Sequence, residues 1–183
     1  MKIRWEPFKV KDIAFFAVMA ALLILCACVA MPFMAVPIFG LRNMATAPFY
    51  GIFGVIALLK VRKPGALTLL ITFNAAILLM MSPVMFINNF GSVLVVELLI
   101  LLIFRSYESD RAIILGAGLV IPCTLPVSIL FSRFLYGKEM SQVVNGKPVY
   151  VVLACIGTVV LSFAGTAIGM KIGKELKKAG KLK

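Results

Sequence analysis

Long apolar runs alternate with short polar connections along almost the whole chain. An α-helix needs roughly 20 apolar residues to cross a hydrocarbon core about 30 Å thick. Six runs approach this length, and charged clusters or Pro, Gly and Asn residues separate them. The spans are expected near residues 12–31, 45–60, 64–81, 84–104, 112–132 and 149–170. The connections are too short for a further domain, so residues 1–183 are predicted to form a single six-helix transmembrane domain.

Composition agrees with this pattern. The chain is 62% hydrophobic and 14% charged, whereas soluble domains are about half apolar and a quarter charged. The expected fold class is therefore an all-α integral membrane bundle. Residues 25–28, Leu-Cys-Ala-Cys, resemble a lipoprotein cleavage site, but Cys26 is atypical there and five further spans follow. We therefore expect the first helix to remain in the mature protein.

The positive charges predict an orientation. With six spans both termini share a side, and 15 of the 19 Lys and Arg residues fall on that side of the membrane. The other side carries only Arg42, Arg133, Lys138 and Lys147. The positive-inside rule therefore predicts that both termini are cytoplasmic. This topology accounts for the net charge of +12 without nucleic acid, because the cations lie at helix ends beside anionic headgroups.

The residue types disfavour an enzyme and a metal site. The chain has no His, and its four cysteines lie inside predicted spans without a CxxC pair, so we expect no metal and no cofactor. Glu97 is the one acidic residue within a span, and it has no second carboxylate to share acid-base chemistry. Its inward face would form either part of a polar pocket or a hydrogen bond between helices.

Further polar and aromatic residues collect toward the outer half of the later spans. With Glu97 they outline a possible outward-facing pocket, although Ser and Thr in spans often hydrogen-bond their own helix or bridge helices instead. The outer segments 31–43 and 132–148, the second with an Asn-Gly turn signal, would either cap this pocket or plug the bundle. The candidate substrate-binding residues are Asn88, Asn89, Phe90, Glu97, Thr124, Ser128, Thr158 and Ser162.

Two helices carry small residues at helical spacing. In the first helix these are Ala14, Ala17, Ala21 and Cys28, and the last helix contains the series Gly165, Gly169 and Gly173. Small residues let membrane helices approach closely. Each series could serve packing inside the bundle or contact with a partner.

These features together resemble the substrate-binding S component of energy-coupling factor (ECF) transporters, which import vitamins and micronutrients. The resemblance rests on six spans in a chain of this length, cytoplasmic ends, an Ala-xxx-Ala pattern at Ala17 and Ala21, and a Lys-rich tail. Residues 48–66 look like S components proposed to carry thiamine precursors, and the tail 165–180 looks closer to the treponemal-streptococcal group.

The resemblance implies a function and partners. The chain would bind one small molecule, vitamin-like or another micronutrient, between helices 4 to 6 and the outer loops, in a prokaryotic cell membrane. Ala17 and Ala21 would contact a transmembrane coupling protein. Two cytoplasmic ATPases would supply energy, since this chain has no Gly-rich Walker loop. A stand-alone secondary transporter is the alternative, although no internal repeat supports it, and an intramembrane enzyme ranks third.

Overall fold

The computed structural model describes residues 7–36, 38–137, 144 and 147–180. These residues form helices and contain no strand. The elements are α1 (Val10–Ala27), the 3-10 helix η1 (Cys28–Ala35), α2 (Leu41–Lys60), α3 (Ala66–Leu79), α4 (Pro83–Phe104), α5 (Asp110–Tyr136) and α7 (Pro148–Lys178).

Five of these helices are long and apolar enough to cross a membrane, and α3 is a shorter apolar helix. α3 has 14 residues, which gives a length of about 21 Å and leaves it short of the hydrocarbon thickness. It is bounded by Gly65, which has a left-handed φ of 86°, and by the segment before Pro83. The helix is therefore shorter at both ends than the predicted span 64–81.

The connection expected at 132–148 also differs from the structure. α5 passes through two internal prolines, Pro122 and Pro126, and continues to residue 136. It ends at Gly137, where φ is 59°. Most of the remaining segment, with the Asn-Gly turn expected at 145–146, lies outside the described residues. The segment after α1, which is expected on the outer side, forms η1 before α2 begins.

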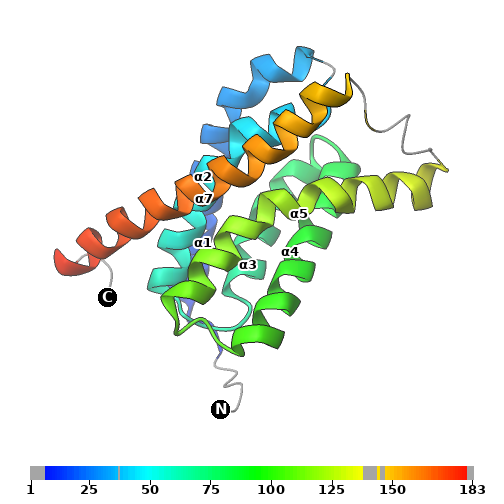
Figure 1. Ribbon diagram of the computed structural model, residues 1–183. Helices are drawn as coiled ribbons and strands as arrows, with labels where there is room; N and C mark the ends of the chain where they lie inside the picture. Colours follow the sequence, from blue (N-terminus) through cyan, green and yellow to red (C-terminus); the bar gives the residue numbers. More distant parts are fainter. Residues whose placement is uncertain (1–6, 37, 138–143, 145–146, 181–183) are drawn as a thin grey trace.

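The helices run up and down between two ends of the molecule (Figure 1). The start of α1 and the α2–α3 and α4–α5 connections lie at one end, and η1 and the α3–α4 connection lie at the other. The last helix crosses the others obliquely. Lys174 near its end pairs with Asp110 at 3.0 Å, and Arg62 pairs with the same carboxylate at 3.2 Å. These ion pairs join the ends of α2, α5 and α7 near the bottom of the molecule in Figure 1. This end of the bundle is the lower end, and the end that holds η1 is the upper end.

α2 is the central helix, and it packs against α1, α3, α5 and α7. Its contact with α7 is the closest because glycines meet the neighbouring backbone. A Cβ on Gly51 would lie 2.6 Å from the Ser162 carbonyl oxygen, and one on Gly169 would lie 2.9 Å from the Ile52 Cα. Gly165 likewise faces the backbone of Pro48. The glycine series of the last helix therefore serves packing inside the bundle.

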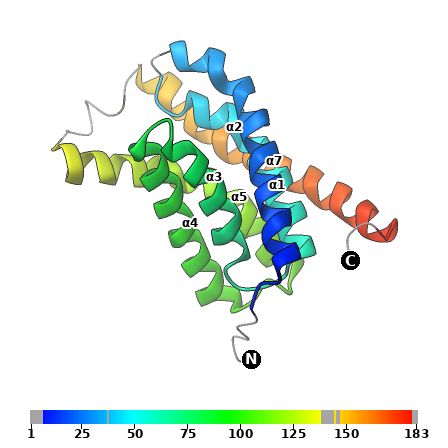
Figure 2. The same cartoon turned by 180° about the vertical axis from the view of Figure 1, so that it is seen from behind.

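α1 lies on the outer surface of the bundle (Figure 2). It buries Phe16, Ala20 and Leu23 against its neighbours. The small residues singled out in the sequence face the other way: Ala14, Ala17, Ala21 and Cys28 are all exposed. Their small size is therefore not explained by packing within the described residues of this chain.

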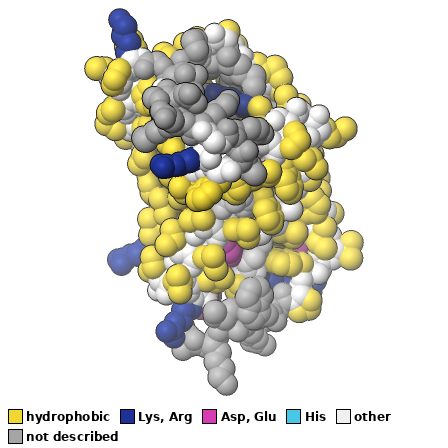
Figure 3. All heavy atoms as spheres, turned by 90° about the vertical axis from the view of Figure 1, so that its right-hand side faces the viewer, with side chains coloured by type: hydrophobic (Ala, Val, Ile, Leu, Met, Phe, Trp, Pro, Cys, Tyr) yellow, Lys and Arg dark blue, Asp and Glu magenta, His cyan; other side chains and the backbone are white. Residues whose placement is uncertain are grey.

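The surface has the pattern expected for a membrane protein. On the face in Figure 3, hydrophobic side chains cover the middle of the molecule and Lys and Arg residues lie toward its two ends. Exposed apolar residues such as Leu98, Leu102 and Ile156 are 60% or more accessible. Such a surface matches a hydrocarbon environment rather than water.

Candidate functional site

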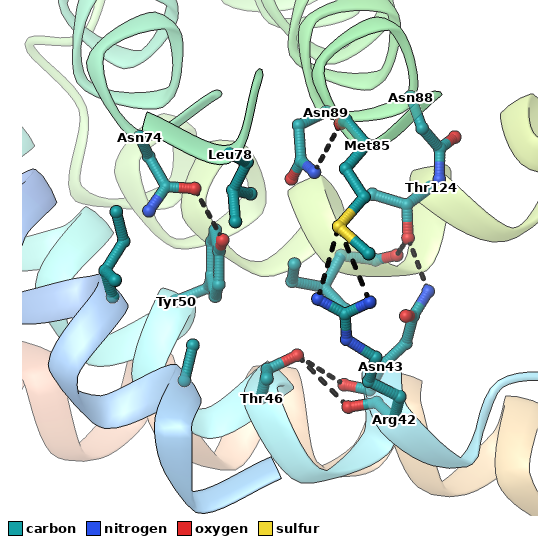
Figure 4. A pocket seen from close by; sticks show the side chains of 13 residues that line it. Arg42, Asn43, Thr46, Tyr50, Asn74, Leu78, Met85, Asn88, Asn89 and Thr124 are labelled. Atoms are coloured by element: carbon teal, nitrogen blue, oxygen red, sulfur yellow. Dashed lines mark hydrogen bonds between the residues drawn. The ribbon is translucent and has the colours of Figure 1, made fainter. Parts of the chain in front are cut away.

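A polar cavity of about 80 Å³ lies toward the upper end of the bundle, the end that holds η1 (Figure 4). It is formed where α1, α2, α3, α4 and α5 meet. Ten of its lining residues are labelled in the figure, and Ile24, Ala27 and Ile121 complete it. The labelled ones are Arg42, Asn43, Thr46, Tyr50, Asn74, Leu78, Met85, Asn88, Asn89 and Thr124.

The first turns of α2 supply one wall of this cavity. The Asn43 amide donates to the Thr124 hydroxyl at 2.7 Å, and that hydroxyl donates to the Ile121 carbonyl at 2.6 Å. The Thr46 hydroxyl lies 3.3 Å from the Arg42 carbonyl and 3.2 Å from the Asn43 carbonyl. These contacts attach the start of α2 to α5 and hold this wall in place.

The opposite wall is formed around Asn74 of α3. The Tyr50 hydroxyl donates to the Asn74 side-chain oxygen at 2.7 Å, and Asn74 is completely buried. Figure 4 shows this pair at one end of the site and the Arg42–Met85 pair at the other. The cavity is therefore polar at both ends, and apolar residues such as Ile24 and Leu78 also line it.

Several polar atoms of the cavity have no protein partner. The Asn74 amide nitrogen and the Asn88 side-chain oxygen are buried without a hydrogen bond. Among the described residues, both terminal guanidinium nitrogens of Arg42 hydrogen-bond only to the Met85 sulfur, at 3.7 Å, and a thioether is a weak acceptor. Unpaired buried polar groups cost folding free energy. Their concentration around one cavity indicates a site prepared for a polar ligand.

Three of the eight predicted substrate residues line this cavity. Asn88 and Asn89 extend from α4, and Thr124 extends from α5. The Asn89 amide donates to the Met85 carbonyl of its own helix at 2.9 Å. Two of the polar residues predicted at the start of the fourth helix, Asn88 and Asn89, therefore lie at the wall of the cavity.

The other five do not line it. Phe90 stacks on Phe86 with ring centroids 5.6 Å apart, and Ser128 lies farther along α5 than Thr124. Thr158 donates to the Ala154 carbonyl of its own helix at 2.7 Å. Ser162 donates to the Gly118 carbonyl at 2.7 Å and so joins α7 to α5. These two hydroxyls are fully buried and already hydrogen-bonded.

Glu97 lies near the opposite end of the bundle from the cavity. Its carboxylate accepts from the Gly65 backbone N–H at 2.8 Å, the Tyr107 hydroxyl at 3.0 Å and the Thr68 hydroxyl at 3.3 Å. It therefore caps the start of α3, where the helix dipole is positive, and fixes the α4–α5 connection. A separate, apolar groove of about 390 Å³ between α3 and α4 also touches Glu97.

The sequence reasoning missed four polar residues of the site: Asn43, Thr46, Tyr50 and Asn74. It treated Arg42 only as an outer-loop charge, whereas α2 begins at residue 41 and brings this side chain to the cavity. Asn74 gave a usable signal, since it is the only Asn among the apolar residues of α3, and a polar amide in a membrane helix requires a partner. Arg42 and Asn74 line the same cavity only because the tertiary fold brings α2 and α3 together.

No metal centre is formed by the part of the chain that the structure describes. Nowhere in that part do three or more His, Cys, Asp or Glu residues come together. The four cysteines are free thiols.

Ala17 and Ala21, the predicted partner contacts, are exposed on the outer face of α1.

Comparison with solved structures identifies the fold. The chain is similar to a solved structure titled "Crystal structure of an S-component of ECF transporter", with a TM-score of 0.59 and 21% sequence identity. The match covers 96% of this chain and 96% of that chain. No protein-family model and no curated protein matches the sequence. The two chains therefore share the fold of an ECF S component over almost their whole length.

Proposed function

We propose that this chain is the membrane-embedded substrate-binding subunit of an ECF-type importer. It captures a small vitamin-like or micronutrient molecule from outside the cell, and the captured molecule then enters by ATP-driven uptake. The observation that carries this proposal is the polar cavity with unpaired hydrogen-bonding groups inside a bundle that has the S-component fold. Asn74, Asn88, Asn89 and Thr124 then contact the substrate.

The proposed orientation puts both termini in the cytoplasm of a prokaryotic cell and the cavity toward the outside. In this arrangement all six apolar helices cross the membrane, with the short α3 buried among its neighbours. The excess of Lys and Arg in the terminal segments supports it. Replacing the native cysteines and placing a Cys at the exposed Lys147 or at the exposed Glu108 tests it. An impermeant thiol reagent should label only the former in intact cells, and the reverse result contradicts the orientation.

The proposed partners are a transmembrane coupling protein and two ATPase subunits. Ala17 and Ala21 form the contact with the coupling protein, which explains why small residues occupy an exposed face. The partners supply the energy, while this chain supplies the binding site. Within the S-component superfamily, we propose that this chain's relatives are the treponemal-streptococcal group and S components for thiamine precursors.

Mass spectrometry of small molecules released from the purified chain tests the binding role. The wild-type chain should release a defined compound, and Asn74→Leu should release at least roughly tenfold less because the cavity loses a buried amide. Thr158→Val is the matched control, since it removes a buried hydroxyl that does not line the cavity. Asn88→Ala provides a second cavity variant if Asn74→Leu fails to fold.

Two outcomes would contradict the proposal. Equal release from wild type, Asn74→Leu and Asn88→Ala would mean that the binding site lies elsewhere. Uptake of the compound by the chain alone in liposomes, with no coupling protein or ATPase, would favour the stand-alone secondary transporter instead.

A further inference from the structure

The cavity contains an uncompensated positive charge. Arg42 is the one charged residue among those that line it. Within the described ranges no carboxylate lies within ion-pair distance of Arg42, and its guanidinium contacts only the sulfur of Met85. A guanidinium has five N–H donors in a planar fork that fits carboxylate and phosphate groups. Leaving this group half-buried and unpaired costs free energy unless an anion pairs with it.

The backbone adds to the same potential. Arg42 and Asn43 lie in the first turn of α2, a helix of 20 residues. That turn contains no acidic residue, and no side chain caps the helix start. The helix dipole therefore contributes positive potential at the cavity wall. An anion beside Arg42 would be stabilised by both the side chain and the helix.

The other end of the cavity offers a hydrogen-bond donor. The Tyr50 hydroxyl occupies the Asn74 oxygen, which leaves the Asn74 amide nitrogen buried and unpaired. Asn74 is 0% exposed, so its amide does not contact bulk water. An acceptor on a bound molecule would satisfy this donor. The apolar side chains of Ile24 and Leu78 would contact the body of the molecule.

We propose that the substrate is a compact organic anion, with its carboxylate or phosphate on Arg42 and a hydrogen-bond acceptor at Asn74. This inference rests on the proposed function and names the substrate class of the same cavity. The cavity volume of about 80 Å³ limits the occupant to a small molecule. Figure 4 shows the two proposed contact residues, Arg42 and Asn74, at opposite ends of the site.

Two sets of similar compounds that differ in charge within each set, together with inorganic phosphate, provide the test. The probes are meta-hydroxybenzoate, meta-hydroxybenzamide and meta-hydroxybenzylamine, together with lactate, lactamide and inorganic phosphate. Thermal unfolding of the purified full-length chain reports binding, since a ligand of the folded state raises the unfolding temperature. The organic anions or phosphate should stabilise the wild type, and the neutral and cationic analogues should bind at least about tenfold more weakly.

Three variants assign the effect to Arg42. Arg42→Gln should remove the preference for the anion over its amide, and Arg42→Lys should keep the preference with lower affinity because the fork is lost. Arg133→Gln is the matched control, as Arg133 is exposed and does not line the cavity. Comparing phosphate with the carboxylates identifies which anionic group Arg42 binds.

The outcomes separate this inference from the proposed function. Binding of only neutral or cationic probes, lost in Asn74→Leu but kept in Arg42→Gln, overturns the anion assignment and leaves the binding site in place. Equal stabilisation of wild type and Arg42→Gln by the anions, or no stabilisation by any anion, also overturns it. If in addition no compound is released from the wild-type chain, the proposed binding role fails as well.

Discussion

Asn74 and Glu97 are buried polar residues of two apolar helices, and their hydrogen bonding differs. Three donors from α3 and the α4–α5 connection surround the Glu97 carboxylate. Burial and the neighbouring carboxylate raise the pKa of Tyr107, so its hydroxyl stays protonated and donates. Asn74 keeps an unpaired amide beside a cavity. A completed network is typical of a structural role, and an incomplete one is typical of a binding site.

Glu97→Ala should destabilise the fold without removing the substrate contacts. The change leaves the Gly65 N–H, the Tyr107 hydroxyl and the Thr68 hydroxyl without their acceptor, at about 1–3 kcal/mol for each donor that stays buried and unpaired. Thermal unfolding in detergent should show a lower unfolding temperature. Tyr107→Phe removes a single bond and should cost about 1 kcal/mol. An unchanged unfolding temperature combined with lost substrate release would instead assign Glu97 to binding.

Sequence reasoning singled out Glu97 because a charge in a span is costly, and it did not consider Asn74. That cost is met by neighbouring elements: the donors that pair with Glu97 come from the start of the preceding helix α3 and from the connection that follows α4. A cavity, in contrast, is formed by residues distant in the sequence, such as Ile24, Asn74 and Thr124. Their proximity depends on helix packing, which hydrophobic periodicity alone does not specify. Asn88 and Asn89 were found because they cluster within the chain.

The contact between α2 and α7 determines how closely the central helices approach. Gly165→Leu should break it, since even a Cβ would overlap the Pro48 backbone, and overpacking typically costs about 1–3 kcal/mol or more. Ala164→Leu adds a similar side chain at the adjacent, exposed position and is the control. The unfolding temperature should fall for the first variant only. A similar fall in both would mean that this interface is not what limits stability.

At the element scale the apolar runs predicted where helices form, and they were less accurate about where helices end. Helix ends depend on single residues: Gly65 and Gly137 adopt left-handed backbone conformations that end the regular pattern. Which small-residue face packs internally was also undetermined by sequence, because both series have helical spacing. The glycines of α7 meet the α2 backbone, while Ala14, Ala17 and Ala21 of α1 are exposed. This difference leaves one small face without a partner inside the described structure.

The whole molecule therefore presents two candidate functional regions, one proposed for the substrate and one for the partner, that are separate in space. The cavity is lined by side chains of the upper half, including Arg42 and Met85. The alanine face lies on the outside of α1, and its residues Ala17 and Ala21 do not line the cavity. Changes on this face should affect assembly with partners while leaving substrate binding intact.

Replacing Ala17 and Ala21 together with Trp tests this separation. Both positions are exposed, so the isolated chain should fold and release its bound compound as the wild type does. The added bulk would keep a partner helix from close approach and remove many small dispersion contacts. The double variant should therefore fail to co-purify with the coupling protein and fail to support uptake. Leu102→Trp, at an exposed position of α4, controls for the indole itself.

The buried side of the same helix provides the contrasting variant. Ala20 is 0% exposed, so Ala20→Trp should destabilise the bundle directly through overpacking. If the Ala17/Ala21 double variant behaves like Ala20→Trp, the alanine face packs within its own chain. If it loses the bound compound but keeps the coupling protein, binding and docking are not separate. Loss of the complex with normal unfolding temperature and normal compound release is the result that assigns the exposed alanines to the partner, because a bundle that is intact and loaded can then fail only at its outer surface.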